Sequence, residues 1–124
     1  MSYKILIADD EPNIVISLEF LMKREGHEVT IARDGQQALD AIRASRPDLV
    51  LLDVMMPIKT GFEVLQELRA DEAIAATKVL MLTAKGRETD TAKGIALGAD
   101  AYMTKPFSTK ELAERVRQLL SAEA

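Results

Sequence analysis

Five polar side chains that could do chemistry each stand directly after, or at the end of, a short apolar run. They are Asp9, Asp10, Asp53, Thr83 and Lys105. The run before Asp53, residues 49–52, shows no polar alternation, which is typical of a central parallel strand covered by helices on both faces. Ligands of open α/β sheets bind beyond the carboxyl ends of the strands. We therefore expect the five side chains to meet at one edge of a sheet.

Three carboxylates brought close together repel one another and destabilise a fold unless a cation joins them. Oxygen ligands without histidine or sulfur select a hard cation, and a sparse set that leaves room for water and phosphate oxygens suits Mg²⁺, or Mn²⁺ in its place. A carboxylate beside such a cation, a lysine and a hydroxyl also suits phosphoryl transfer by in-line attack. Asp53 is the candidate nucleophile.

Three of the five residues also have an ordinary structural explanation. Asp53 could cap the following loop, since aspartate often begins turns. Lys105 could be a surface ammonium, and Thr83 an ordinary strand residue. Five such residues at strand ends would rarely occur together by chance. A shared site explains their positions better.

The composition excludes several kinds of site. The chain of 124 residues has no cysteine and one histidine, so disulfides, thiolate metal sites, cysteine nucleophiles and a histidine-rich metal cluster are excluded. His27 lies in a predicted helix-to-strand turn, and we expect it to be solvated and without a role. A formal net charge of -4 provides no overall basic surface for nucleic acid. We expect a cytoplasmic protein with no signal peptide, membrane span or polybasic membrane-binding tail.

The apolar pattern predicts five strands that alternate with five helices. The strands are expected at residues 5–8, 28–32, 49–52, 78–83 and 101–104, and the helices at residues 12–25, 38–45, 61–68, 89–97 and 109–120. Asp34-Gly35 marks a turn, whereas Thr60 and Ser108 each open a capping box. The lengths suit right-handed crossovers, so we predict one α/β domain over residues 1–124, a doubly wound parallel sheet with helices on both faces. Met22, Met81 and Met103 are expected to fill the core.

Four motifs resemble the receiver domains of bacterial two-component response regulators, the family of the chemotaxis protein CheY. They are residues 7–11, residues 51–57 with Gly61, residues 82–84 and residues 98–107. The resemblance covers the whole chain and is specific because the motifs occur together. It implies the strand order 2-1-3-4-5 and the flavodoxin-like three-layer sandwich of that family.

The resemblance implies a phosphorylation switch. Asp53 would take a phosphoryl group from the phosphohistidine of a sensor histidine kinase or phosphotransfer protein, or from a small phosphodonor. Asp10 and Asp53 would bind Mg²⁺ directly, Asp9 would act through water, and Met55 would supply its backbone carbonyl. The domain would be a switch, not an enzyme, with at most slow self-dephosphorylation.

The resemblance also implies how the switch would respond. Lys105 would pair with the phosphoryl oxygens, and its bond to Pro106 would be cis. Thr83 would move to hydrogen-bond the phosphate, and Tyr102 would turn inward to fill the space. The fourth helix, fifth strand and fifth helix would form the output face, which would act on a target protein or an output domain.

Two further expectations depend on departures from family patterns. Met55 and Lys85 stand where the chemotaxis protein has an amide and a carboxylate, and neither side chain is suited to position an attacking water. We therefore expect a longer-lived phosphorylated form. A homodimer through the output face could use Lys85, Arg87, Glu111 and Arg115. Thr91 and Ala101, however, stand where winged-helix transcription factors commonly place charges for that dimer.

Two other functional classes remain open from the sequence. A flavodoxin-like cofactor binder needs hydrogen-bond donors after its first strand, where this chain has the acidic residues 9–11. An aspartyl-phosphate phosphatase of the familiar type has a second acid two residues after the nucleophile, where this chain has Met55. Within the receiver family, the chain could be a stand-alone receiver or the N-terminal part of a transcriptional regulator. Any DNA binding would then belong to another domain.

Overall fold

A parallel sheet with helices on both faces forms the domain. A computed structural model describes residues 2–84 and 88–121. The strands in these residues are β1 (Lys4–Ala8), β2 (Glu28–Ala32), β3 (Leu49–Asp53), β4 (Lys78–Ala84) and β5 (Ala101–Lys105). The helices are α1 (Pro12–Arg24), α2 (Gly35–Ser45), α3 (Gly61–Ala70), α4 (Glu88–Ala96) and α5 (Thr109–Ser121). The strand order 2-1-3-4-5 is the one expected, and every pairing is parallel.

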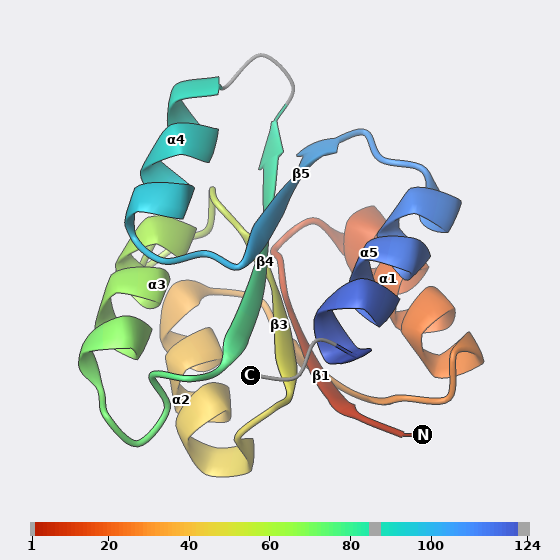
Figure 1. Cartoon of the computed structure of the whole chain (residues 1–124), viewed down its shortest axis with the longest axis horizontal. Coiled ribbons are helices and arrows are strands. Elements are labelled where there is room, and N and C mark those ends of the chain that lie inside the picture. The colour runs from red at the N-terminus through yellow and green to blue at the C-terminus, as the bar shows by residue number, and fades with distance from the viewer. Residues whose placement is uncertain (1, 85–87, 122–124) are drawn as a thin grey trace.

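The sheet divides the core into two parts. Helices α1 and α5 cover one face, and α2, α3 and α4 cover the other (Figure 1). Alternate side chains of a strand point to opposite faces. Leu49 and Leu51 accordingly pack in the cluster with α1 and α5, while Val50 and Leu52 pack in the cluster with α2 and α3. The fully buried β3 thus holds Asp53 in a fixed position at its end.

Side-chain caps fix where several helices begin. Thr60 and Glu63 form the expected capping box at α3, with hydrogen bonds of 3.0 and 3.2 Å. Ser108 accepts a hydrogen bond from the backbone N–H of Glu111 at the start of α5. Asp34 caps α2 by accepting from the N–H of Gln37, so the predicted turn is a helix start.

Two sequence expectations need correction. Helical spacing predicts that the residues of α1 facing the core are Ile14, Leu18, Leu21 and Met22. The last three are buried, whereas Ile14 is only partly buried and Val15, at 1% exposure, is the buried residue of the first turn. His27 is half-buried, and its Nδ1 accepts a hydrogen bond of 3.2 Å from the N–H of Tyr3. The turn packs beneath the start of β1, and burial lowers the pKa of His27. His27 therefore has a structural role.

Among the described residues, no helix is long and apolar enough to cross a bilayer.

Candidate functional site

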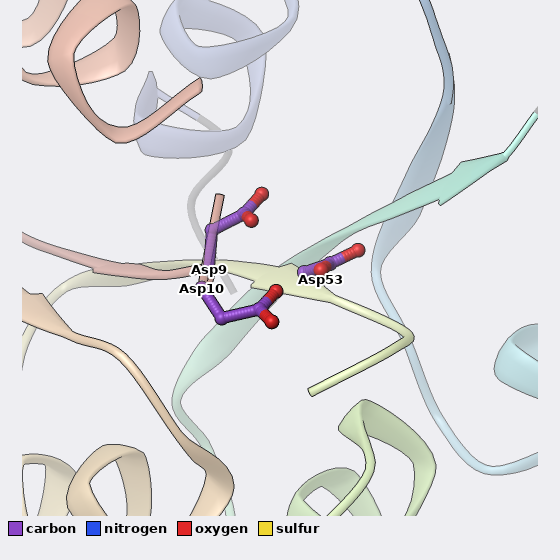
Figure 2. Close-up of side chains that lie close together, drawn as sticks. All are labelled: Asp9, Asp10 and Asp53. Atoms are coloured by element: carbon purple, nitrogen blue, oxygen red, sulfur yellow. The ribbon is translucent and has the colours of Figure 1, made fainter. Parts of the chain in front are cut away.

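The three aspartates meet at the carboxyl ends of two neighbouring strands. β1 pairs with β3 in a register that sets Ala8 beside Leu52, so the residues that follow, Asp9 and Asp53, lie close together. One carboxylate oxygen of each of Asp9, Asp10 and Asp53 lies within 4.8 Å of the others. Figure 2 shows the three side chains gathered where the two strands end.

A pocket of about 330 Å³ opens at this cluster, and we call it the acidic pocket. Its lining is Asp10, Glu11, Asp53, Val54, Met55, Ala84 and Lys105, and Lys105 is also hydrogen-bonded to the buried Asp9. Asp10 is exposed, Asp53 is 7% exposed and Asp9 is fully buried. Asp10 and Glu11 are therefore open to solvent, whereas Asp9 and Asp53 lie in a less polar environment.

Lys105 is the cation that the structure places among these acids. Its Nζ donates hydrogen bonds to Oδ2 of Asp9 at 3.0 Å and to Oδ1 of Asp53 at 3.2 Å. The side chain is 17% exposed, so the surface-ammonium explanation is wrong. Asp9 also accepts a hydrogen bond of 2.9 Å from the N–H of Glu11, which leaves both its oxygens paired. The peptide bond from Lys105 to Pro106 is cis.

One ammonium does not balance three carboxylates. Burial and then the charge of Asp9 raise the pKa of Asp53 from 3.8 to about 6, although Lys105 and a backbone hydrogen bond from Met55 oppose the shift. Burial disfavours the charge on Lys105, but its hydrogen bond to Asp9 and the charges of Asp53 and Asp9 outweigh burial and raise its pKa. The negative charge of ionised Asp53 is thus only partly neutralised by Lys105.

The geometry fits a hard divalent cation. The donor set consists of carboxylate oxygens, which Mg²⁺ and Mn²⁺ prefer, and three acids leave other coordination positions for water or phosphate oxygens. A cation here would relieve the repulsion that raises the pKa of Asp53. The acidic pocket is therefore suited to hold such a cation next to a carboxylate able to attack phosphorus.

Thr83 and Tyr102 lie on the strands beyond β3. Thr83 is 1% exposed, and its hydroxyl donates a hydrogen bond of 3.1 Å to the carbonyl of Ala84, so it is not bonded to the carboxylates. Tyr102 is 40% exposed. The structure thus brings Thr83 to the same edge as Asp53 and leaves the ring of Tyr102 outside.

The output face expected from the sequence is only partly described. Lys85, Arg87 and the side chain of Thr91 lie outside the described residues. Glu111 and Arg115 are exposed and line a hollow of about 340 Å³ with Tyr102 and residues of the β5–α5 connection.

Two features of the acidic pocket were not expected. Glu11 belongs to its lining, and the run of acids at residues 9–11 was the pattern that could have revealed it. Met55 also lines the pocket, and its exposure of 60% was not indicated by the sequence.

Comparison with known proteins gives one consistent result. Residues 5–117 match the family model of the response regulator receiver domain. The chain is 46% identical over 120 residues, 97% of its length, to the alkaline phosphatase synthesis transcriptional regulatory protein PhoP of Bacillus subtilis. It covers 49% of that relative, so the chain spans about half the length of the curated relative it matches.

Solved structures agree in fold. The chemotaxis response regulator CheY4 of Vibrio cholerae superposes with a TM-score of 0.89 at 31% identity, covering 96% of this chain and 99% of that one. The receiver domain of the sensor histidine kinase PA1611 from Pseudomonas aeruginosa gives a TM-score of 0.90 at 27% identity, covering 98% and 100%. That structure holds a magnesium ion in its active-site cleft.

Proposed function

We propose, from the premise that this chain belongs to the family of response regulator receiver domains, that Asp53 is its phosphoacceptor. The domain is a phosphoacceptor switch of a two-component system. One observation carries the assignment to Asp53. It is the nearly buried acid of the pocket, with its pKa raised to about 6 and a lysine already bonded to it.

Phosphoryl transfer needs the protein mainly to position the reacting groups and to stabilise charge. A carboxylate oxygen of Asp53 attacks phosphorus, the bond from phosphorus to the donor nitrogen of a phosphohistidine breaks, and that nitrogen keeps the electron pair. The product is an acyl phosphate on Asp53. Lys105 would exchange its bond to Asp53 for one to a phosphoryl oxygen, while its bond to Asp9 keeps it in place.

Asp10 and Asp53 would hold Mg²⁺ directly, with Asp9 acting through water and Met55 through its backbone carbonyl. Support comes from the three clustered carboxylates and from the magnesium bound in the similar receiver of PA1611. The ion supplies neutralisation of the transferring oxygens. Mn²⁺, which takes the same oxygen ligands, would serve in its place.

Thr83 and Tyr102 would report the arrival of phosphate. The hydroxyl of Thr83 can leave the carbonyl of Ala84 for a phosphoryl oxygen, and the exposed ring of Tyr102 can turn inward. The fourth helix, fifth strand and fifth helix would then present a changed output face.

The phosphate on Asp53 should be long-lived, since the thioether of Met55 cannot hold an attacking water. Lys85, which the sequence also indicated as unable to position a water, lies outside the described residues.

The partners would be a sensor histidine kinase or phosphotransfer protein and a target or output domain. The likeness to PhoP favours the N-terminal half of a transcriptional regulator, in which DNA binding belongs to the other half. A cytoplasmic location and a homodimer through the output face are part of the same proposal. The domain would have no catalytic cycle beyond slow loss of its own phosphate.

The two alternative classes are not favoured. The acidic pocket would repel the phosphate of a flavin cofactor, because Asp10 and Glu11 occupy the loop that would have to bind it. The phosphatase class lacks its second acid, because Met55 stands two residues after Asp53.

Incubation with acetyl phosphate and Mg²⁺ tests the proposal. We expect intact-mass analysis to find one added phosphoryl group on the wild type and none on Asp53→Asn. Asp40→Asn, which changes an exposed aspartate of α2 outside the pocket, is the matched control and should be labelled like the wild type. Unlabelled wild type, or a phosphoryl group mapped to another residue, would refute the assignment.

A further inference from the structure

The methionines of this chain differ sharply in exposure. Of those in the described residues, Met22, Met56, Met81 and Met103 are between 0% and 9% exposed, as expected for residues that fill the core. Met55 is 60% exposed. Oxidants in solution reach a thioether in proportion to its exposure, so Met55 is the described methionine that reacts first.

The position of Met55 connects it to the phosphoacceptor. Met55 lines the acidic pocket together with Asp53 and Lys105, and its backbone forms a hydrogen bond with the carboxylate of Asp53. A change in the polarity of its side chain therefore occurs on a residue of the pocket where a phosphoryl group on Asp53 would meet water.

We propose that Met55 is a peroxide-sensitive modification site that sets the lifetime of the phosphate on Asp53. The sulfur donates an electron pair to one oxygen of hydrogen peroxide, the O–O bond breaks, the sulfoxide forms and water leaves. The sulfur is oxidised by two electrons and the peroxide is reduced by two. Methionine sulfoxide reductases reverse the change, which makes the site a switch.

The consequence follows from hydrogen bonding and rests on the function proposed above. A thioether is a weak acceptor, whereas a sulfoxide oxygen is a strong one that can hold a water molecule beside the acyl phosphate. One additional hydrogen bond to an attacking water corresponds to roughly a threefold to tenfold faster hydrolysis. Oxidation of Met55 should therefore shorten the phosphorylated state.

The first arm of the test does not involve phosphate. The wild type is treated with increasing hydrogen peroxide, and peptide mass analysis follows each methionine. We expect Met55 to be oxidised at a lower peroxide concentration than Met22, Met56, Met81 or Met103. Oxidation of these buried residues at the same concentration as Met55 would overturn the proposal.

The second arm measures loss of phosphate after the donor is removed. Each protein is compared with its own untreated sample. We expect peroxide to shorten the lifetime in the wild type about threefold to tenfold and to leave the lifetime of Met55→Leu unchanged, because leucine cannot be oxidised. Met55→Gln, which supplies an amide oxygen at a similar reach, should lose phosphate faster than Met55→Leu without peroxide.

The outcomes of the two arms can be distinguished. Selective oxidation of Met55 with an unchanged lifetime, or an equal response in Met55→Leu, would overturn the lifetime switch and leave Asp53 as the phosphoacceptor. Failure to label untreated wild type would instead refute the proposed function.

Discussion

Two polar clusters at opposite edges of the sheet differ in how well their charges are matched. At the amino ends of β4 and β5, the Arg69 cluster joins one guanidinium by five hydrogen bonds to the carbonyls of Ala75, Thr77 and Gly98 and to the carboxylate of Asp100. At the carboxyl ends, the acidic pocket sets one ammonium against three carboxylates. The hydrogen-bond donors of the Arg69 guanidinium are all used, whereas the acidic pocket retains excess negative charge.

Backbone strain also differs between these two clusters, although another non-glycine residue with positive φ, Arg46 at +47°, ends α2 before β3. Within the Arg69 cluster, the left-handed position with φ of +102° is Gly98, and glycine adopts this conformation without steric strain. In the loop after Asp53, Ile58 has φ of +72° although it is β-branched and 76% exposed. Strain of this kind is concentrated at functional sites. The comparison teaches that one edge is built for stability and the other for a ligand.

Arg69→Ala should have the largest effect on stability. It removes the guanidinium donors of the Arg69 cluster, so that three carbonyls lose this partner and the carboxylate of Asp100 keeps only the hydrogen bond from the N–H of Val79; we expect a loss of about 2–4 kcal/mol in the free energy of unfolding. Urea denaturation measures the change. The matched control is Arg43→Ala, which breaks the exposed pair with Asp71 and should stay within about 1 kcal/mol. Equal effects of the two variants would mean that the Arg69 cluster has no special structural role.

Asp53→Asn should have the opposite sign. The pKa of Asp53 is about 6 in the folded chain and 3.8 as an ordinary carboxyl, so the folded state holds the proton longer and the free energy of unfolding falls as pH rises between these values. Asparagine does not ionise, so the free energy of unfolding of the variant does not fall in this way. Because the site is open to solvent on one side, we expect a gain of only about 1–2 kcal/mol at pH 7.5 without Mg²⁺.

The pH dependence provides the control for this variant. The advantage of Asp53→Asn should shrink as pH falls from 6 towards 3.8 and vanish well below 3.8, where the wild-type carboxyl is protonated in both states. Asp40→Asn changes an exposed residue of α2 outside the acidic pocket and is the control variant. Thermal denaturation across this pH range measures both variants, and an Asp53→Asn variant less stable than the wild type at pH 7.5 would contradict the excess of charge.

Ile58→Gly should produce the smallest effect. Glycine removes the steric strain of a β-branched residue at φ of +72° but adds freedom to the unfolded chain, so a net gain of about 0.5–1 kcal/mol is expected. Ile58→Val keeps the branching and should give no gain. If the valine and glycine variants had equal stability in urea, the backbone here would store no strain.

The fold and most of the candidate site could be predicted because both depend on short apolar runs. The runs of β1, β3 and β4 specify mostly buried strands, and parallel strands bring the residues at their ends to one edge, which placed Asp9, Asp53 and Thr83 correctly relative to the sheet. In α1 the prediction was wrong at Ile14 alone, because Ile14 and Val15 are both apolar and only packing decides between them.

Other features could not be read from the sequence. The Arg69 cluster uses backbone carbonyls at positions 75, 77 and 98, which leave no pattern of residue types. The burial of His27 depends on where the start of β1 lies. The bridge from Lys105 to both Asp9 and Asp53 depends on a side-chain conformation that strand periodicity does not specify.

The charge state of Asp53 tests the account most directly. A carbon-detected NMR titration of its carboxyl gives its pKa in the folded chain. We expect a value of about 6 without divalent cations, followed by a fall when Mg²⁺ is added. An ordinary value near 3.8 that Mg²⁺ does not alter would contradict the claim that this edge of the sheet carries unbalanced charge for a cation and a phosphoryl group.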